Sequence, residues 1–311
     1  MLRIDLDDRH VERIRAVSPR LELIQLQSEG EVLEAMPDVH VVFGEVSREM
    51  FARGDRLRWV QVTGAGVDAR LFGDLVGSDV VLTSEKGVVG VHLAEHALAL
   101  LLGLTRGIAT AIRKPGWDQR MPIRSAAWEI EGLTMGIVGL GGTGIALADR
   151  ARGFGMRVVA VDPEDVQTPD SVEACWKMDR LHDLLRQSDV VAICAPLTAE
   201  TEGMFDEKAF AQMRSHALVI NVTRGRIIDE AALMAALDNG EIGGAGLDVT
   251  PREPLPDDHP LWRMDNVIVT PHAAGGSPKR RERVVNLFCE NLRRFLDGQT
   301  LVSVIDKKKG Y

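Results

Sequence analysis

The chain has 311 residues, of which 45% are hydrophobic and 27% charged, and its formal net charge is −9. This length predicts about two domains with ample core, and the acidic balance argues against nucleic acid or an anionic membrane as a partner. The N-terminus is acidic where a signal peptide would be basic, no apolar run is long enough to span a bilayer, and the three cysteines lack metal-ligand spacing, so we expect a cytoplasmic protein without a metal site.

The N-terminal part alternates short apolar runs with helical runs. Strands are predicted at residues 2–6, 21–26, 39–43, 59–63 and 80–83, and helices at 8–17, 28–36 and 47–53. This alternation predicts a parallel sheet with helices on both faces. Because this part contains no GxGxxG sequence, we expect an α/β domain other than the nucleotide-binding one.

A long helical pattern follows, with apolar residues three and four positions apart from His92 to about Lys114. We interpret it as a helix that connects two domains, stopped by Pro115 and Gly116. Residues 118–132 are expected to be looser, and Lys307 to Lys309 are expected to form a solvated tail.

The stretch from Met135 to Asp162 reads as a strand, a glycine turn, a helix and a second strand that ends on an acid. This is the order of a dinucleotide-binding βαβ unit. Gly139 allows the tight turn, Gly141 lets the backbone approach a pyrophosphate, and Gly144 lets the helix pack closely on the sheet. Together with Gly142 and Thr143, these residues are the predicted phosphate-binding turn, at a helix N-terminus that favours anions.

Asp162 lies where the acid that binds the adenosine ribose is expected. A carboxylate accepts a hydrogen bond from the 2′-hydroxyl of NAD and repels the 2′-phosphate of NADP. Pro163, Glu164 and Asp165 follow, with no arginine among them. The sequence therefore predicts NAD as the cofactor.

After Asp162 the alternation resumes. Strands are predicted at residues 189–194, 217–221, 244–249 and 267–270, and helices at 181–187, 206–213, 229–237 and 279–296. We therefore expect an α/β fold of two doubly wound, Rossmann-like parallel-sheet domains with a cleft between them. Residues 1–98 with 276–311 would form the substrate domain, and residues 99–275 the NAD-binding domain.

Polar residues follow three of these strands: Arg224, Glu253 and His272. They lie in motifs at residues 219–226, 247–254 and 270–276, and further motifs occupy 62–68, 87–97, 136–144 and 195–201. In these motifs, taken in order over nearly the whole chain, the sequence resembles the D-isomer-specific 2-hydroxyacid dehydrogenase family.

The resemblance implies a hydride transfer between NAD(H) and a small D-2-hydroxy acid or 2-keto acid. His272 would be the acid/base, since histidine exchanges protons near neutral pH. Glu253 would fix the orientation of its ring. Arg224 would bind the substrate carboxylate and polarise the carbonyl. Ala65 and Gly66 resemble the loop whose N–H groups receive the carboxylate.

The remaining implied roles concern the cofactor and assembly. Asp248 resembles the residue that contacts the nicotinamide carboxamide. Ala195, Pro196, Val222, Thr223 and Gly275 complete the expected cofactor contacts. A homodimer is expected from the resemblance, supported by the long helix and the tryptophan-containing segment after it. Glu95 and His96 are interpreted as structural residues of that helix, and Arg226 ranks below Arg224.

Two alternatives remain at this point. An NAD-sensing corepressor on the same fold can retain the three catalytic residue types, although this chain has no long flanking tails for partner recruitment. Formate dehydrogenases of this fold tend to carry glutamine beside the histidine, and Glu253 argues against that reaction. The sequence leaves the substrate open among glyoxylate, hydroxypyruvate, phosphoglycerate and branched keto acids.

Overall fold

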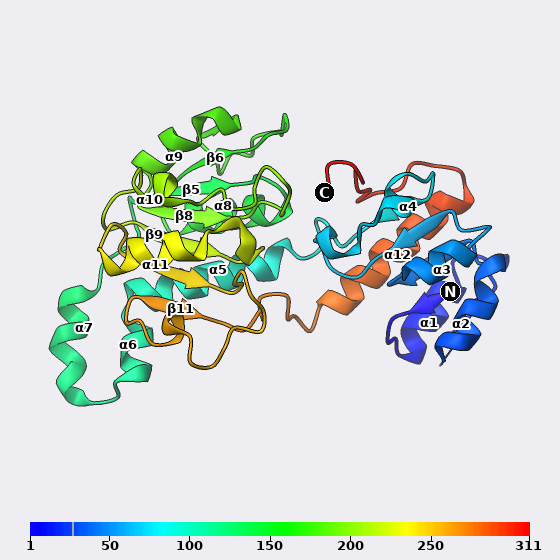
Figure 1. Cartoon of the computed structure of the whole chain (residues 1–311), viewed down its shortest axis with the longest axis horizontal. Helices are drawn as coiled ribbons and strands as arrows, with labels where there is room; N and C mark the ends of the chain where they lie inside the picture. Colours follow the sequence, from blue (N-terminus) through cyan, green and yellow to red (C-terminus); the bar gives the residue numbers. More distant parts are fainter. Residues whose placement is uncertain (27) are drawn as a thin grey trace. The chain divides into compact units, whose positions relative to one another are not determined.

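The computed structural model describes residues 1–26 and 28–311 (Figure 1). Its contacts divide the chain into two compact units, Met1–Val89 with Ser277–Tyr311, and Gly90–Gly276. Each unit has one parallel sheet with an apolar core on both faces, so the predicted α/β class is confirmed. Within the described residues, we find no helix with the length and apolarity needed to cross a membrane.

The first unit contains a four-stranded parallel sheet in the order β1-β2-β3-β4. The strands are β1 (Leu2–Arg3), β2 (Val41–Gly44), β3 (Trp59–Gln61) and β4 (Val81–Thr83). Each face of this sheet has its own apolar core, and neighbouring residues of β2 point into different ones. Phe43 packs in the core beneath α1 (Asp8–Arg15) and α12 (Arg280–Leu296). Val42 packs in the core beneath α2 (Glu29–Ala35) and α3 (Arg48–Arg53). Phe43 and Phe288 of α12 stack at 4.1 Å between ring centroids.

Two expectations for this unit are wrong. Residues 21–26 form no strand, although the Leu2 N–H donates to the Ile24 carbonyl at 2.9 Å. The C-terminal tail is anchored, because the Ile305 N–H donates to Leu82 O and the Lys307 Nζ donates to the carbonyl oxygens of Leu75, Ser78 and Val80. The tail therefore packs against α4 (Gly73–Val76) and β4.

The second unit contains seven parallel strands in the order β11-β10-β9-β8-β5-β6-β7. They are β5 (Thr134–Val138), β6 (Arg157–Val161), β7 (Ala174–Trp176), β8 (Val190–Ile193), β9 (Leu218–Asn221), β10 (Gly244–Leu247) and β11 (Val267–Val269). The strand order reverses between β5 and β8, and such a switch point opens a crevice at the carboxyl ends of the strands. The sequence did not reveal β7, a three-residue edge strand.

Helices cover both faces of this sheet (Figure 1). Ile137 of β5 joins the cluster that contains α5 (Gly90–Thr105) and α8 (Gly142–Gly153), and Val138 joins the opposite one. The opposite cluster holds α9 (Leu181–Gln187), α10 (Glu207–Phe210) and α11 (Glu230–Asp238). Strands buried on both faces explain the nearly continuous apolar runs in the sequence.

The helix predicted from residue 92 to 114 is interrupted. It ends as α5 at Thr105 and resumes as α6 (Ile108–Arg113), because Gly107 adopts a left-handed conformation with φ of +66°. The segment expected to be loose contains α7 (Arg120–Ala126), which extends away from the sheet in Figure 1. Short 3₁₀ turns occupy Met36–Asp38, Asp68–Arg70, Trp117–Gln119, Met178–Arg180, Gly225–Ile227 and Pro260–Trp262.

Candidate active site

The glycine turn after β5 combines close backbone packing with one open position. Gly139 has φ of +93°, and a Cβ there would lie 2.7 Å from the backbone nitrogen of Ala195. A Cβ at Gly144 would lie 2.3 Å from the Gly139 carbonyl oxygen, whereas one at Gly141 meets nothing within 4 Å. Two glycines therefore permit close backbone packing, and the third leaves open space before the N-terminus of α8.

Asp162 lies directly after β6 and is tied to this turn. Its Oδ2 accepts the Leu140 N–H at 2.7 Å, and its Oδ1 accepts the Glu164 N–H at 2.9 Å. The residue is 8% exposed, so its carboxylate is held rigidly at the carboxyl edge of the sheet. Each oxygen has a second lone pair, so a hydroxyl donor can still bind.

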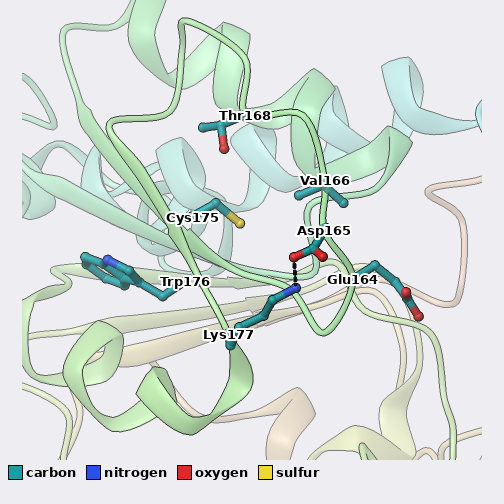
Figure 2. A pocket seen from close by; sticks show the side chains of 7 residues that line it. All are labelled: Glu164, Asp165, Val166, Thr168, Cys175, Trp176 and Lys177. Atoms are coloured by element: carbon teal, nitrogen blue, oxygen red, sulfur yellow. Dashed lines mark ion pairs between the residues drawn. The ribbon is translucent and has the colours of Figure 1, made fainter.

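A small pocket of about 110 Å³ lies beside Asp162, between the loop after β6 and strand β7 (Figure 2). Its lining residues are Glu164, Asp165, Val166, Thr168, Cys175, Trp176 and Lys177. The Lys177 Nζ lies 2.6 Å from Asp165 Oδ1 and donates to the Pro163 carbonyl at 3.1 Å. The one cation of the pocket therefore fastens the loop. Burial raises the pKa of the Cys175 thiol, which keeps it protonated.

His272 and Glu253 form a direct pair. Glu253 follows β10 and His272 follows β11, the neighbouring strand. The His272 Nδ1 lies 2.7 Å from Glu253 Oε2, and the other oxygen, Oε1, accepts the Thr250 N–H at 3.1 Å. The His272 side chain is 49% exposed. Glu253 thus orients an imidazole that solvent or a ligand can reach.

Arg224 follows β9, the strand on the other side of β10. Its Nη1 donates to the Thr223 carbonyl at 2.9 Å, and its own carbonyl accepts from Asn221 Nδ2 at 2.9 Å. A Cβ at Gly225 would lie 1.9 Å from the carbonyl carbon of Thr250, so the loops after β9 and β10 touch through their backbones. The structure therefore brings Arg224, Glu253 and His272 to three adjacent strand ends.

Asp248 organises the turn that carries His272. Its carbonyl accepts the His272 N–H at 2.8 Å, Oδ1 accepts the Ala273 N–H at 2.8 Å, and Oδ2 accepts the Ala274 N–H at 2.9 Å. The residue is 1% exposed, and burial by itself raises the pKa of its carboxyl. Hydrogen bonds from His96, Thr270 and the two amides outweigh burial and lower this pKa to about 2. Sequence reasoning missed this support from His96 and Thr270.

The other predicted residues lie as follows. Ala195 and Pro196 follow β8, where the Pro196 carbonyl accepts the Thr201 hydroxyl at 2.7 Å. Val222 is buried after β9, and the Thr223 N–H donates to the Asn221 side chain at 3.1 Å. Gly142 and Thr143 lie in the first turn of α8, and Gly275 follows β11. Ala65 and Gly66 follow β3 in the first unit. Arg226 is exposed and pairs with Glu202.

Across residues 1–26 and 28–311, no group of three or more His, Cys, Asp or Glu side chains is arranged to hold a metal ion. The residues described above are a set of backbone turns, three carboxylates (Asp162, Asp248 and Glu253), a histidine and an arginine. Such a set can bind an anionic cofactor and exchange a proton with a carboxylate-bearing ligand.

Known proteins resemble the chain over most of its length. The model of the D-isomer specific 2-hydroxyacid dehydrogenase NAD binding domain matches residues 98–274. A glyoxylate reductase of Korarchaeum cryptofilum (strain OPF8) is 33% identical over 292 residues, which cover 90% of this chain and 87% of the relative.

Solved structures agree. The D-isomer specific 2-hydroxyacid dehydrogenase from Xanthobacter autotrophicus Py2, in complex with NADPH and MES, is 30% identical with a TM-score of 0.80, covering 99% of this chain and 97% of its own. Apo D-mandelate dehydrogenase of Rhodotorula graminis is 25% identical with a TM-score of 0.82, covering 98% and 96%. On this agreement of fold, turn and sequence, the chain belongs to the D-isomer-specific 2-hydroxyacid dehydrogenase family of NAD(P)-dependent oxidoreductases.

Proposed function

We propose that the protein reduces a small 2-keto acid to its D-2-hydroxy acid, or catalyses the reverse oxidation, with His272 as the acid/base. The observation that supports this most is the 2.7 Å contact between His272 Nδ1 and Glu253 Oε2 beside the Arg224 loop. With Nδ1 facing the carboxylate, Nε2 is the ring nitrogen that delivers a proton to the carbonyl oxygen. A bound nicotinamide supplies the hydride in that direction.

Arg224 would bind the substrate carboxylate and stabilise the charge that grows on the carbonyl oxygen. Its planar guanidinium fits two oxygens at once, which a lysine does not. The second unit would bind the dinucleotide, and the backbone N–H groups at Ala65 and Gly66 are proposed to receive a substrate carboxylate. Asp248, Ala195, Pro196, Val222, Thr223 and Gly275 are proposed to line the cofactor site.

NAD(H) is the proposed cofactor. Three acids, Asp162, Glu164 and Asp165, lie in the four-residue segment that would bind the adenosine ribose. The nearby Lys177 ammonium already contacts Asp165 and the Pro163 carbonyl. A 2′-phosphate would meet this negative charge. The relative from Xanthobacter autotrophicus Py2 was solved with NADPH, so both cofactors belong in the test. A kcat/KM higher with NADPH than with NADH would refute the assignment.

The test is a turnover screen with NADH or NADPH and a panel of glyoxylate, hydroxypyruvate, a phosphorylated keto acid and branched keto acids, plus formate with NAD. Glyoxylate leads because the relative from Korarchaeum cryptofilum is a glyoxylate reductase. His272→Ala should lower kcat by about 10²–10⁴-fold while NADH still binds. Near-full kcat in that variant, or turnover of formate alone, would refute the proposal.

A homodimer through α6 and α7 is also proposed. Four large apolar side chains are exposed on this segment, namely Ile108, Ile112, Trp117 and Met121, and Trp117 is 87% exposed. Exposed apolar side chains gathered on one segment are typical of a protein–protein contact, and a second copy of this chain is the proposed partner. Ile112→Glu should convert a dimer to a monomer in analytical ultracentrifugation, and a wild-type monomer would refute this proposal.

A further inference from the structure

We propose that His96, on α5, is a positioning residue that holds the catalytic turn at His272 through Thr270 and Asp248. This inference rests on the proposed role of His272 as the acid/base and adds a residue from outside the strand-end loops. Among residues 1–26 and 28–311, the polar contacts of His96 are with Thr270 and Asp248, so it would act on the reaction through them.

The turn needs a brace because its backbone is strained. His272 has φ of +52°, in the left-handed region that residues with a Cβ seldom occupy. Such a conformation persists only where surrounding contacts hold it, and it is common at functional sites. Here Asp248 accepts three consecutive N–H groups, from His272, Ala273 and Ala274. The first of these bonds ends on the backbone carbonyl of Asp248 and the other two on its carboxylate, so the carboxylate helps to fix the turn that carries the imidazole.

The Asp248 carboxylate is in turn held from α5. The Thr270 hydroxyl lies 2.6 Å from Asp248 Oδ1, and His96 Nε2 lies 2.8 Å from the same hydroxyl and 3.3 Å from Oδ1. A hydroxyl has one proton, and here it donates that proton to Asp248. The Thr270 oxygen must therefore accept from His96, which places a proton on Nε2. His96 thus donates to both partners.

The position of His96 in the fold makes it a rigid support. It belongs to the 16-residue helix α5, which packs against the sheet through buried leucine and alanine side chains. His96 is 23% exposed at its side chain and Asp248 is 1% exposed, so water competes weakly for these bonds. Removing His96 leaves Thr270 without its donor and Asp248 with one donor fewer, and the turn at His272 should relax.

The experiment compares His96→Ala, His96→Gln and Thr270→Val in the full-length protein. The readouts are kcat and KM for the keto acid that the wild type reduces, the NADH dissociation constant, and amide hydrogen exchange at Ala273 and Ala274 without any ligand. His216→Ala is the matched control, because His216 also bonds an aspartate, Asp189, but at the amino ends of the strands.

We expect His96→Ala to lower kcat by about 10- to 100-fold, because a small displacement of a reacting group costs that much, and to speed exchange at Ala273 and Ala274. NADH binding should change little. His96→Gln should restore most of the kcat and most of the protection from exchange, since the glutamine amide nitrogen can replace Nε2. Thr270→Val should have the same effects as His96→Ala. Unchanged kcat and exchange in His96→Ala, or no rescue by glutamine, would overturn the proposal.

The exchange measurement separates this inference from the proposed function. If the wild type reduces no keto acid, the proposed function fails, while exchange at Ala273 and Ala274 still decides whether His96 holds the turn. If His96→Ala does not fold, Thr270→Val decides the same point, since normal exchange and kcat in that variant overturn the proposal. An equal effect of His216→Ala would also overturn it.

Discussion

Replacing Asp248 with asparagine should destabilise the second unit by an amount that follows from its contacts. The carboxylate accepts the Ala273 and Ala274 N–H groups on different oxygens, so an asparagine must turn its NH₂ group towards one donor. The pKa of Asp248 falls from 3.8 to about 2 on folding. At about 1.36 kcal/mol per pKa unit, the ionised carboxylate contributes roughly 2 kcal/mol of stability near neutral pH.

The sign of the pH dependence is fixed by the direction of this shift. The pKa is lower in the folded state, so the contribution is complete above pH 3.8 and is lost as the pH falls towards 2. Urea unfolding of wild type and Asp248→Asn, followed by circular dichroism, should show the full stability difference at pH 7 and pH 5. At pH 3 about half of the ionisation-dependent part should remain.

Asp265→Asn provides the matched control. Asp265 pairs with Lys114 at 2.6 Å, but its side chain is 68% exposed, and exposed ion pairs contribute little. We expect the control to unfold like the wild type at pH 7. A stability difference for Asp248→Asn that stays constant from pH 7 to pH 3, or one no larger than that of the control, would refute the reasoning.

Three further substitutions test other contacts. Gly225→Ala should abolish turnover and lower the melting temperature, because its Cβ would lie 1.9 Å from the Thr250 backbone, whereas Gly153→Ala meets nothing within 4 Å and should be tolerated. Arg70→Ala should raise KM for the keto acid with unchanged NADH affinity, since Arg70 Nη1 holds the Gly66 carbonyl at 2.9 Å; equal KM values would contradict this. Lys307→Met should cost about 2 kcal/mol in thermal unfolding, because it removes an ammonium that donates to the carbonyl oxygens of Leu75, Ser78 and Val80. Lys308→Met, at an exposed neighbour, should not.

The sequence predicted most of the strands of the second unit and the glycine turn that follows β5. Apolar runs such as residues 135–138 and 218–220 are buried on both faces, which gives a signal strong enough to place every strand of this sheet except β7 within a few residues. The glycine turn was predictable because each glycine has a steric reason, now visible as the 2.7 Å and 2.3 Å approaches at Gly139 and Gly144. Local chemistry determined these features, so a local reading of the sequence found them.

Most of the errors came from contacts between distant residues. Residues 21–26 have the composition of a strand, yet no ladder forms there, because pairing depends on a neighbour that the local sequence does not specify. The helical pattern ran through Gly107, since one glycine lowers helix propensity only modestly. The Lys307 ammonium is held by carbonyls of residues 75–80, more than two hundred positions away. The sequence likewise did not indicate which residues contact His96, because Thr270 and Asp248 are remote from it in sequence.

The candidate site follows from one property of the fold. Strands β9, β10 and β11 are consecutive in the chain and adjacent in the sheet, so Arg224, Glu253 and His272 follow the carboxyl ends of three neighbouring strands. The loops then lock pairwise, through Gly225 against Thr250 and through Asp248 against the His272 turn. Each loop contacts the next, so substitutions in two of these loops should not be independent. Their combined effect on kcat should differ from the product of their separate effects, as expected for residues in contact.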